Sequence, residues 1–194
     1  MYAIEMLNIT KKFGDFYANK DITIQVKNNE IHALLGENGA GKSTLMSVLF
    51  GMYHQEAGVI KLDGKEVDIK DPKHANKLGI GMVHQHFKLI KNFTVAENII
   101  LGMEEVKGGK IDLDSAANKI SELSKKYGLE VNPKALVGDI SVGMQQRVEI
   151  LKMLYRDANI LIFDEPTAVL TPAEIEEFLA ILKNLQAEGK TILL

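Results

Sequence analysis

The sequence predicts an α/β fold with a parallel sheet, a β-rich N-terminal portion and a helical insertion. Short apolar runs that are typical of buried strands occur at 31–35, 80–83 and 160–163. Helical patterns separate these runs, as expected when crossover helices join parallel strands. The first thirty residues instead alternate partly between apolar and polar residues, which is typical of strands with one buried face.

The composition fits one ordinary globular domain. The chain has 194 residues, of which 46% are hydrophobic and 25% charged. Its 23 basic and 26 acidic residues give a net charge of −3, so we expect no nucleic-acid partner. The absence of cysteine excludes disulfides and thiolate metal sites. No stretch reaches the roughly 20 apolar residues of a membrane-spanning helix, and the N-terminus does not resemble a signal peptide.

The N-terminal third is predicted to contain strands, a glycine-rich turn and a helix. Strand patterns end at turns near 12–15 and 28–29, and Asp63-Gly64 favours a tight hairpin between strands 59–62 and 66–69. A helix is expected to start at Lys42 and to end before Gly51. Its apolar face would consist of Leu45, Val48 and Leu49.

Residues from about 94 to 154 are predicted to be mostly helical, with one helix ending at Gly128 and another at about 143–156. After the strand at 160–163, Thr171 is predicted to cap a helix with Pro172 in its first position and Glu174 closing a capping box. The buried stripe of this helix would contain Ile175, Phe178, Leu179 and Leu182. A further strand is expected at 191–194.

Residues 36–43, Gly-Glu-Asn-Gly-Ala-Gly-Lys-Ser, fit the phosphate-loop pattern G-x-x-x-x-G-K-[ST]. Glycines let the chain curl so that successive backbone N–H groups face several negative charges at once. Lys42 can reach the terminal phosphates of a nucleotide, and the Ser43 hydroxyl can bind Mg²⁺. The alternative, an ordinary glycine-rich turn, is disfavoured because the motif lies between a strand pattern and a helix pattern.

Two adjacent acids, Asp164 and Glu165, follow the apolar run at 160–163. Ligands of open α/β sheets bind at the carboxyl ends of the strands, where the phosphate loop is also expected. Asp164 would hold Mg²⁺, and Glu165 would act as the general base that activates water. The alternative is a solvated turn before Pro166, which the phosphate loop elsewhere in the chain makes less favourable.

These two motifs are typical of P-loop NTPases, and three further segments make the chain resemble ABC ATPases. Residues 140–147 resemble the signature motif LSGGQ followed by Q-Q-R, Gln85 resembles the Q-loop glutamine, and Phe13 matches the aromatic position that stacks on adenine. The resemblance covers the whole chain. It implies a RecA-like mixed sheet core with an antiparallel β subdomain, and a helical subdomain inserted at about 91–155 in a single domain of residues 1–194.

The resemblance also implies cofactors and roles. ATP and Mg²⁺ would be the cofactors, Glu165 the catalytic residue, and Ser43, Gln85 and Asp164 the metal ligands. Two such domains would pack head to tail, so that Ser141, Gly143 and Gln145 face the ATP of the partner domain. The nucleotide-binding residues would be Phe13, Gly36, Glu37, Asn38, Gly39, Ala40, Gly41, Lys42, Ser43 and Thr44.

Some departures from the family pattern are informative. Val142 and Met144 replace glycine and glutamine in the signature, and 168–171 lacks the usual D-loop aspartate. Stretches 141–152 and 165–172 resemble the ATPase subunits of simple-sugar and nucleoside importers, and 82–87 is closer to the nucleoside branch. The resemblance implies a peripheral subunit on the cytoplasmic face of the membrane, which powers permease subunits and indirectly serves a solute-binding protein.

ATPases of this kind are usually longer and carry two ATPase halves in one chain. Leu194 precedes the expected H-loop histidine, so we expect a truncated first half that binds ATP but hydrolyses it slowly. Two other classes stay open. A soluble ABC ATPase working without a permease would usually carry basic arms or long coiled-coil insertions, and a non-hydrolysing nucleotide-binding module would not need Glu165. His84 and His86 flank Gln85, but no third ligand at a suitable spacing completes a metal site.

Overall fold

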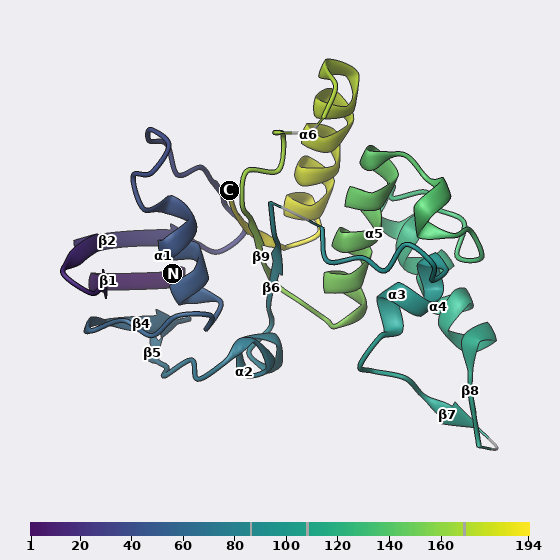
Figure 1. Cartoon of the computed structure of the whole chain (residues 1–194), viewed down its shortest axis with the longest axis horizontal. Coiled ribbons are helices and arrows are strands. Elements are labelled where there is room, and N and C mark those ends of the chain that lie inside the picture. The colour runs from purple at the N-terminus through teal and green to yellow at the C-terminus, as the bar shows by residue number, and fades with distance from the viewer. Residues whose placement is uncertain (86, 108, 169) are drawn as a thin grey trace. The chain divides into compact units, whose positions relative to one another are not determined.

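The computed structural model describes residues 1–85, 87–107, 109–168 and 170–194 (Figure 1). The described chain divides into two compact units. The chain leaves the first unit and returns to it twice: the first unit contains Met1–Met82, Ala158–Asp164 and Gln186–Leu194, and the second contains Val83–Asp157 and Glu165–Leu185. Among the described residues, no helix is both long and apolar enough to cross a membrane.

One sheet of the first unit is antiparallel, in the order β2-β1-β4-β5. Asp63 and Gly64 connect its last two strands with positive φ angles of 48° and 76°, which confirms the predicted tight turn. The second strand of this hairpin is shorter than the predicted 66–69, because beyond Val67 the chain turns inward and buries Ile69. The strands of this sheet are β1 (Tyr2–Phe13), β2 (Phe16–Lys27), β4 (Ala57–Leu62) and β5 (Lys65–Glu66).

A second sheet contains β3 (Ile31–His32), β10 (Thr191–Leu193), β9 (Ile160–Phe163) and β6 (Ile80–Val83), in that order. β10 pairs in parallel with both β3 and β9, and every residue of β6 and β9 is buried, as predicted. The predicted buried strand at 31–35 is wrong beyond His32, since Leu35 is 93% exposed. Within the described chain β3 lies at the edge of this sheet, so Leu35 enters the following loop without a layer to cover it.

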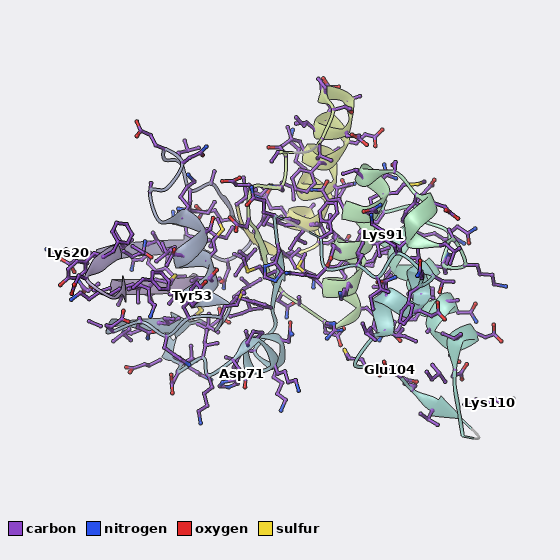
Figure 2. The ribbon with its side chains drawn as sticks, viewed as in Figure 1. Lys20, Tyr53, Asp71, Lys91, Glu104 and Lys110 are labelled. Atoms are coloured by element: carbon purple, nitrogen blue, oxygen red, sulfur yellow. The ribbon has the colours of Figure 1, made fainter. Side chains whose placement is uncertain are left out.

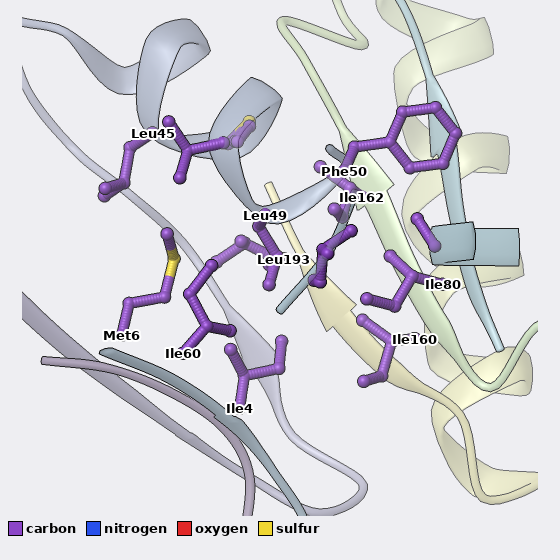
Figure 3. Close-up of a cluster of buried hydrophobic side chains, with 14 of the residues drawn as sticks. Ile4, Met6, Leu45, Leu49, Phe50, Ile60, Ile80, Ile160, Ile162 and Leu193 are labelled. Carbon is purple, nitrogen blue, oxygen red and sulfur yellow. The ribbon is translucent and has the colours of Figure 1, made fainter. Parts of the chain in front are cut away.

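Helix α1 (Lys42–Leu49) packs into the core of the first unit (Figure 3). Its residues Leu45, Val48 and Leu49 are buried, so the predicted apolar face is confirmed. Figure 3 shows Leu49 beside Ile60 and Leu193, which come from the two different sheets. Full burial of one such side chain contributes roughly 1.5–3 kcal/mol. The helix therefore starts at a fixed place relative to both sheets.

The other short helix of this unit, α2 (Pro72–Lys77), is capped by Asp71, whose side chain accepts a hydrogen bond from the His74 N–H (Figure 2). The second unit is mostly helical, as predicted for 94–154, but it also contains a small hairpin near Gly109. Gly108 lies outside the described residues. The elements of this unit are α3 (Val95–Ile100), β7 (Val106–Lys107), β8 (Lys110–Ile111), α4 (Leu113–Tyr127), the 3₁₀ turn η1 (Val137–Asp139), α5 (Val142–Tyr155) and most of α6 (Pro172–Ala187).

Helix α6 begins as predicted. The Thr171 N–H and hydroxyl both donate to Glu174 Oε2 at 2.9 Å, and the Glu174 N–H donates to Thr171 Oγ1. The predicted buried stripe is confirmed at Phe178 and Leu182, but Ile175 is only half-buried and Leu179 is 49% exposed. The buried residues Phe178, Ile181, Leu182 and Leu185 follow the spacing of a single helix face, and Leu179 falls beside that face.

Candidate functional site

Residues 36–41 of the first unit form an exposed loop that folds back on itself around Lys42. The Lys42 Nζ donates to the carbonyl oxygens of Gly36 at 2.7 Å and Glu37 at 2.9 Å. The Ala40 N–H donates to the same Glu37 oxygen. Gly39 and Gly41 have φ angles of 85° and 88°, which residues other than glycine rarely adopt. The loop therefore surrounds one ammonium group and needs glycine where the sequence supplies it.

Helix α1 begins at this loop without a side-chain cap. Its N-cap residue is Gly41, and no described side chain bonds to the N–H groups of the first turn. Those N–H groups have no partner within the helix and carry partial positive charge. This arrangement suits an anion, and Ser43 and Thr44 follow Lys42 in the same turn.

The loop has a backing that sequence analysis missed. Ala18 and Asn19 of β2 lie directly behind Gly41, and the Asn19 Nδ2 donates to the Gly41 carbonyl at 3.1 Å. A Cβ atom on Gly41 would lie 2.2 Å from the Ala18 carbonyl oxygen. No local signal could have identified these residues, because they meet the loop only through the fold.

Ser43 and Asp164 lie together in the first unit although 121 residues separate them. The Ser43 hydroxyl donates to Asp164 Oδ1 at 2.7 Å. Asp164 directly follows β9, so the predicted meeting of the two motifs at the carboxyl end of the parallel strands is observed. A hydroxyl and a carboxylate are the oxygen ligands that Mg²⁺ prefers, and Mg²⁺ usually takes few protein ligands. The described residues contain no cluster of three or more His, Cys, Asp or Glu side chains that could hold a metal alone.

Phe13 ends β1 with its side chain 45% exposed, so it can offer a ring to a flat ligand. Tyr53 packs edge-on against it, with ring centroids 5.1 Å apart at an angle of 82°. The Lys11 ammonium lies 5.3 Å from the centroid of the Phe13 ring. Sequence analysis did not single out Tyr53 or Lys11, the two residues that contact the Phe13 ring here.

Gln85 and Glu165 are paired in the second unit. The Gln85 Nε2 donates to Glu165 Oε2 at 2.7 Å, which leaves the Gln85 carbonyl oxygen and the other Glu165 oxygen available. Glu165 is exposed and has a φ of 49°, in the left-handed region that few residues other than glycine adopt. Such strain concentrates at functional sites. His86, next to Gln85, lies outside the described residues.

The signature residues lie at the start of α5. Ser141 is the N-cap, and its Oγ accepts from the Met144 N–H at 3.3 Å. A Cβ atom on Gly143 would lie 2.6 Å from Glu174 Oε1 of α6, so a side chain here would require the Glu174 carboxylate to move. The Gln145 Nε2 donates to the carbonyls of Val137 and Ile140, so its amide is held against the preceding turn of its own chain.

A buried acid in the middle of α5 was also missed. Glu149 Oε1 accepts from the Lys88 N–H at 2.7 Å. Lys88 lies three residues after Gln85 in the chain. Burial raises the pKa of the Glu149 carboxyl, although Lys152 and the Lys88 N–H act in the opposite direction. Lys152 also donates to the Lys88 carbonyl. Side chains of α5 therefore bind both the N–H and the carbonyl of Lys88.

Comparisons with known proteins agree with this arrangement. A family model described as ABC transporter matches residues 19–168, which is more than half of the chain. This chain belongs to the ABC transporter family. Its ABC relatives include the guanosine import ATP-binding protein NupO of Bacillus subtilis (strain 168), which is 63% identical over 192 residues. That alignment covers 99% of this chain and 38% of the relative.

A second ABC relative, the nucleoside import ATP-binding protein NupA of Lactococcus lactis subsp. cremoris (strain MG1363), is 61% identical over 98% of this chain and 38% of its own length. The xylose import ATP-binding protein XylG of Thermoanaerobacter pseudethanolicus (strain ATCC 33223 / 39E) is 46% identical, again over 98% and 38%. The chain thus spans about four tenths of the length of the curated ABC relatives it matches.

Solved ABC structures share the fold. A nucleotide-free ATP-binding cassette from an ABC transporter is 27% identical and gives a TM-score of 0.86, covering 100% of this chain and 80% of that one. A dimeric ATP-binding cassette bound to ADP and Pi is also 27% identical, with a TM-score of 0.79 and coverage of 98% and 86%. The predicted fold, a P-loop NTPase core with antiparallel and parallel sheets and a helical part, is confirmed.

Proposed function

We propose that this chain binds Mg-ATP on residues 36–44, and that the complete protein hydrolyses ATP to drive the import of nucleosides. The hydrogen bond between Ser43 and Asp164 is the observation that carries the proposal. It joins the end of the phosphate loop to the first acid of the second motif. A turn without a ligand would have no need to place a carboxylate beside the open end of a helix.

In this proposal Lys42 and the N–H groups at the start of α1 bind the terminal phosphates, and Phe13 stacks on the adenine. The Ser43 hydroxyl and the Asp164 carboxylate would hold Mg²⁺. The side-chain oxygen of Gln85 would be a further ligand, as the family resemblance implies. When bound, the ion neutralises charge that develops on the phosphates. Glu165 accepts a proton from the attacking water through the oxygen that Gln85 does not occupy.

We further propose that two such domains work head to tail, with Ser141 and Gly143 meeting the phosphate held by the partner domain. The dimeric cassette bound to ADP and Pi supports this part of the proposal. Gln145 would keep the turn before α5 in place, since its amide is held by Val137 and Ile140. Residues 91–155 would be the helical subdomain of a single ATPase domain, as the sequence predicts.

Nucleosides are the proposed cargo because relatives named for guanosine and nucleoside import are 63% and 61% identical, whereas the xylose import relative is 46% identical. The permease, the indirect solute-binding partner and the location at the cytoplasmic face of the membrane are part of the same proposal. The relatives' names, which describe ATP-binding proteins of import systems, support the permease. The solute-binding partner and the membrane face rest on the family resemblance of the sequence.

The test is calorimetric titration of the chain with ATP, with and without Mg²⁺. Lys42→Ala should weaken Mg-ATP binding about 100-fold, because charge-assisted hydrogen bonds contribute roughly 1.5–3 kcal/mol each. Asp164→Asn should abolish most of the gain in affinity that Mg²⁺ provides. Lys65→Ala, an exposed lysine of β5, is the matched control and should bind normally. Wild-type chain without magnesium-dependent ATP binding would refute the proposal.

A further inference from the structure

We propose that Asn19 is a positioning residue for the phosphate loop, because its side-chain amide fixes the orientation of the peptide that joins Gly41 to Lys42. The inference rests on the proposed function, which assigns residues 36–44 to nucleotide binding. Asn19 comes from β2, and its side chain acts through the loop backbone.

The Gly41 carbonyl is held from two directions. The Asn19 Nδ2 donates to it at 3.1 Å from β2, and the Leu45 N–H donates to it at 2.9 Å as the first turn of α1 closes. Helix closure alone would supply only the second of these bonds. The bond from Asn19 ties the open end of α1 to the antiparallel sheet.

Holding this carbonyl also aims an N–H group. A trans peptide unit is planar, so its carbonyl and its N–H point in opposite directions, and none of the described peptide bonds is cis. With the Gly41 oxygen turned toward Asn19, the Lys42 N–H must point away from β2. That N–H belongs to the uncapped start of α1, where the proposed phosphate site lies.

The packing behind Gly41 leaves no room for a side chain at this position. A Cβ atom on Gly41 would lie 2.2 Å from the Ala18 carbonyl oxygen and 2.6 Å from the Asn19 Nδ2. Rotating the Asn19 amide by half a turn would place its oxygen against the Gly41 carbonyl oxygen, which repels it. The donor therefore has one workable orientation.

This orientation leaves the other end of the amide unpaired. Asn19 is 6% exposed, and its Oδ1 has no hydrogen-bond donor among the described residues. An unpaired buried acceptor destabilises a folded protein, and an apolar side chain would avoid that cost. Asn98, a buried asparagine of α3, shows the contrast, because its Oδ1 accepts from the Ile90 N–H and its Nδ2 donates to two carbonyls. Asn98 is thus satisfied at both ends of its amide, whereas Asn19 is satisfied only toward the loop.

The decisive experiment compares nucleotide affinity with stability in one variant. Asn19→Leu should bind Mg-ATP about 10-fold more weakly, the equivalent of one hydrogen bond, while its urea midpoint stays the same or rises because the unpaired acceptor is gone. A purely structural residue would lose stability first. Unchanged affinity, or a loss of affinity that only follows a loss of stability, would overturn the inference.

Asn19→Asp keeps the volume of the side chain and removes the donor. It should bind Mg-ATP at least as weakly as the leucine variant, because a carboxylate oxygen would face the Gly41 carbonyl and add negative charge behind the loop. Affinity equal to that of the wild type would contradict the proposed role. This variant also provides a test if the leucine variant does not fold.

Ser124→Ala is the matched control, since the buried Ser124 hydroxyl also donates to a backbone carbonyl, that of Leu129, in the second unit. It should lower the urea midpoint and leave ATP affinity unchanged. The two proposals fail in different ways. Wild-type chain that does not bind Mg-ATP refutes the proposed function, whereas equal binding by wild type and Asn19→Leu refutes only the role of Asn19.

Discussion

Helices α1 and α3, one in each unit, begin in opposite ways. At the start of α3, the Thr94 Oγ1 accepts from the Glu97 N–H and the Glu97 carboxylate accepts from the Thr94 N–H, so the helix end is closed by its own side chains. At the start of α1, the N-cap is Gly41 and no described side chain closes the first turn. The same backbone groups bind capping side chains in one helix and have no described side-chain partner in the other, where we propose that a phosphate binds.

The other described α-helices follow the closed pattern. Asp71, Asp112, Ser141 and Thr171 each accept a hydrogen bond from a backbone N–H of the helix that follows them. The comparison teaches that an anion-binding helix is recognisable by what its first turn lacks. A capping carboxylate would occupy the same N–H groups that a phosphate needs.

Ser141 closes the start of α5 in the same way as the other hydroxyl caps. Its Oγ accepts from the Met144 N–H at 3.3 Å, between the 3.2 Å of the Thr94 cap and the 3.4 Å of the Thr171 cap. The proposed partner of this end, a phosphate held by a second domain, would have to compete with that bond.

The largest expected effect comes from filling the open end of α1. Gly41→Ala should lower the free energy of unfolding by about 3 kcal/mol and abolish ATP binding. The new Cβ would clash with the Ala18 carbonyl oxygen, and the left-handed φ of this position disfavours alanine. Gly39→Ala is the matched control. It has a similar φ but nothing within 4 Å of the new Cβ, so it should cost only about 1 kcal/mol. Urea unfolding of the two variants measures the difference, and equal losses would show that the backing of β2 is unimportant.

A smaller effect is expected from opening a closed end. Thr94→Ala should lower the free energy of unfolding by about 1 kcal/mol, the usual loss for removing an N-cap side chain, and should leave ATP affinity of the chain unchanged. Thr167→Ala, an exposed threonine in the turn after Glu165, controls for the substitution itself. If Thr94→Ala instead created a measurable affinity for sulfate at the start of α3, the capping side chain alone would account for the difference between the starts of α1 and α3.

The smallest effect concerns pH. Hydrogen bonds from the Thr94 N–H and hydroxyl lower the pKa of Glu97 below its ordinary 4.5. A lowered folded-state pKa means that this contribution to stability is present above the unfolded pKa and is lost as pH falls through the folded one. Wild type should therefore exceed Glu97→Gln in melting temperature at pH 6, and the gap should shrink below about pH 4.5. A gap that is constant with pH would rule out the carboxylate as the source.

Local signals predicted several elements correctly. The Asp63-Gly64 turn, the Thr171–Glu174 capping box and the helix that starts at Lys42 depend on neighbours within four residues, so the sequence displays them directly. The errors at Leu35 and Leu179 have the opposite origin. Whether an apolar side chain at the end of a strand or beside a helix face is covered depends on elements far away in the chain, and here none covers them fully.

By itself, the sequence determined the buried strands at 80–83 and 160–163, the helices that start at Lys42 and Pro172, the phosphate loop with its lysine, and the acids that follow the apolar run at 160–163. These features depend on backbone preferences and on the spacing of residues close together in the chain, both of which can be seen directly in the sequence. The tertiary structure decided what surrounds them. It placed Asp164 on Ser43 across 121 residues and set Asn19 behind Gly41 across 22, because hydrogen bonds between distant segments form only after the hydrophobic core has fixed where each segment lies.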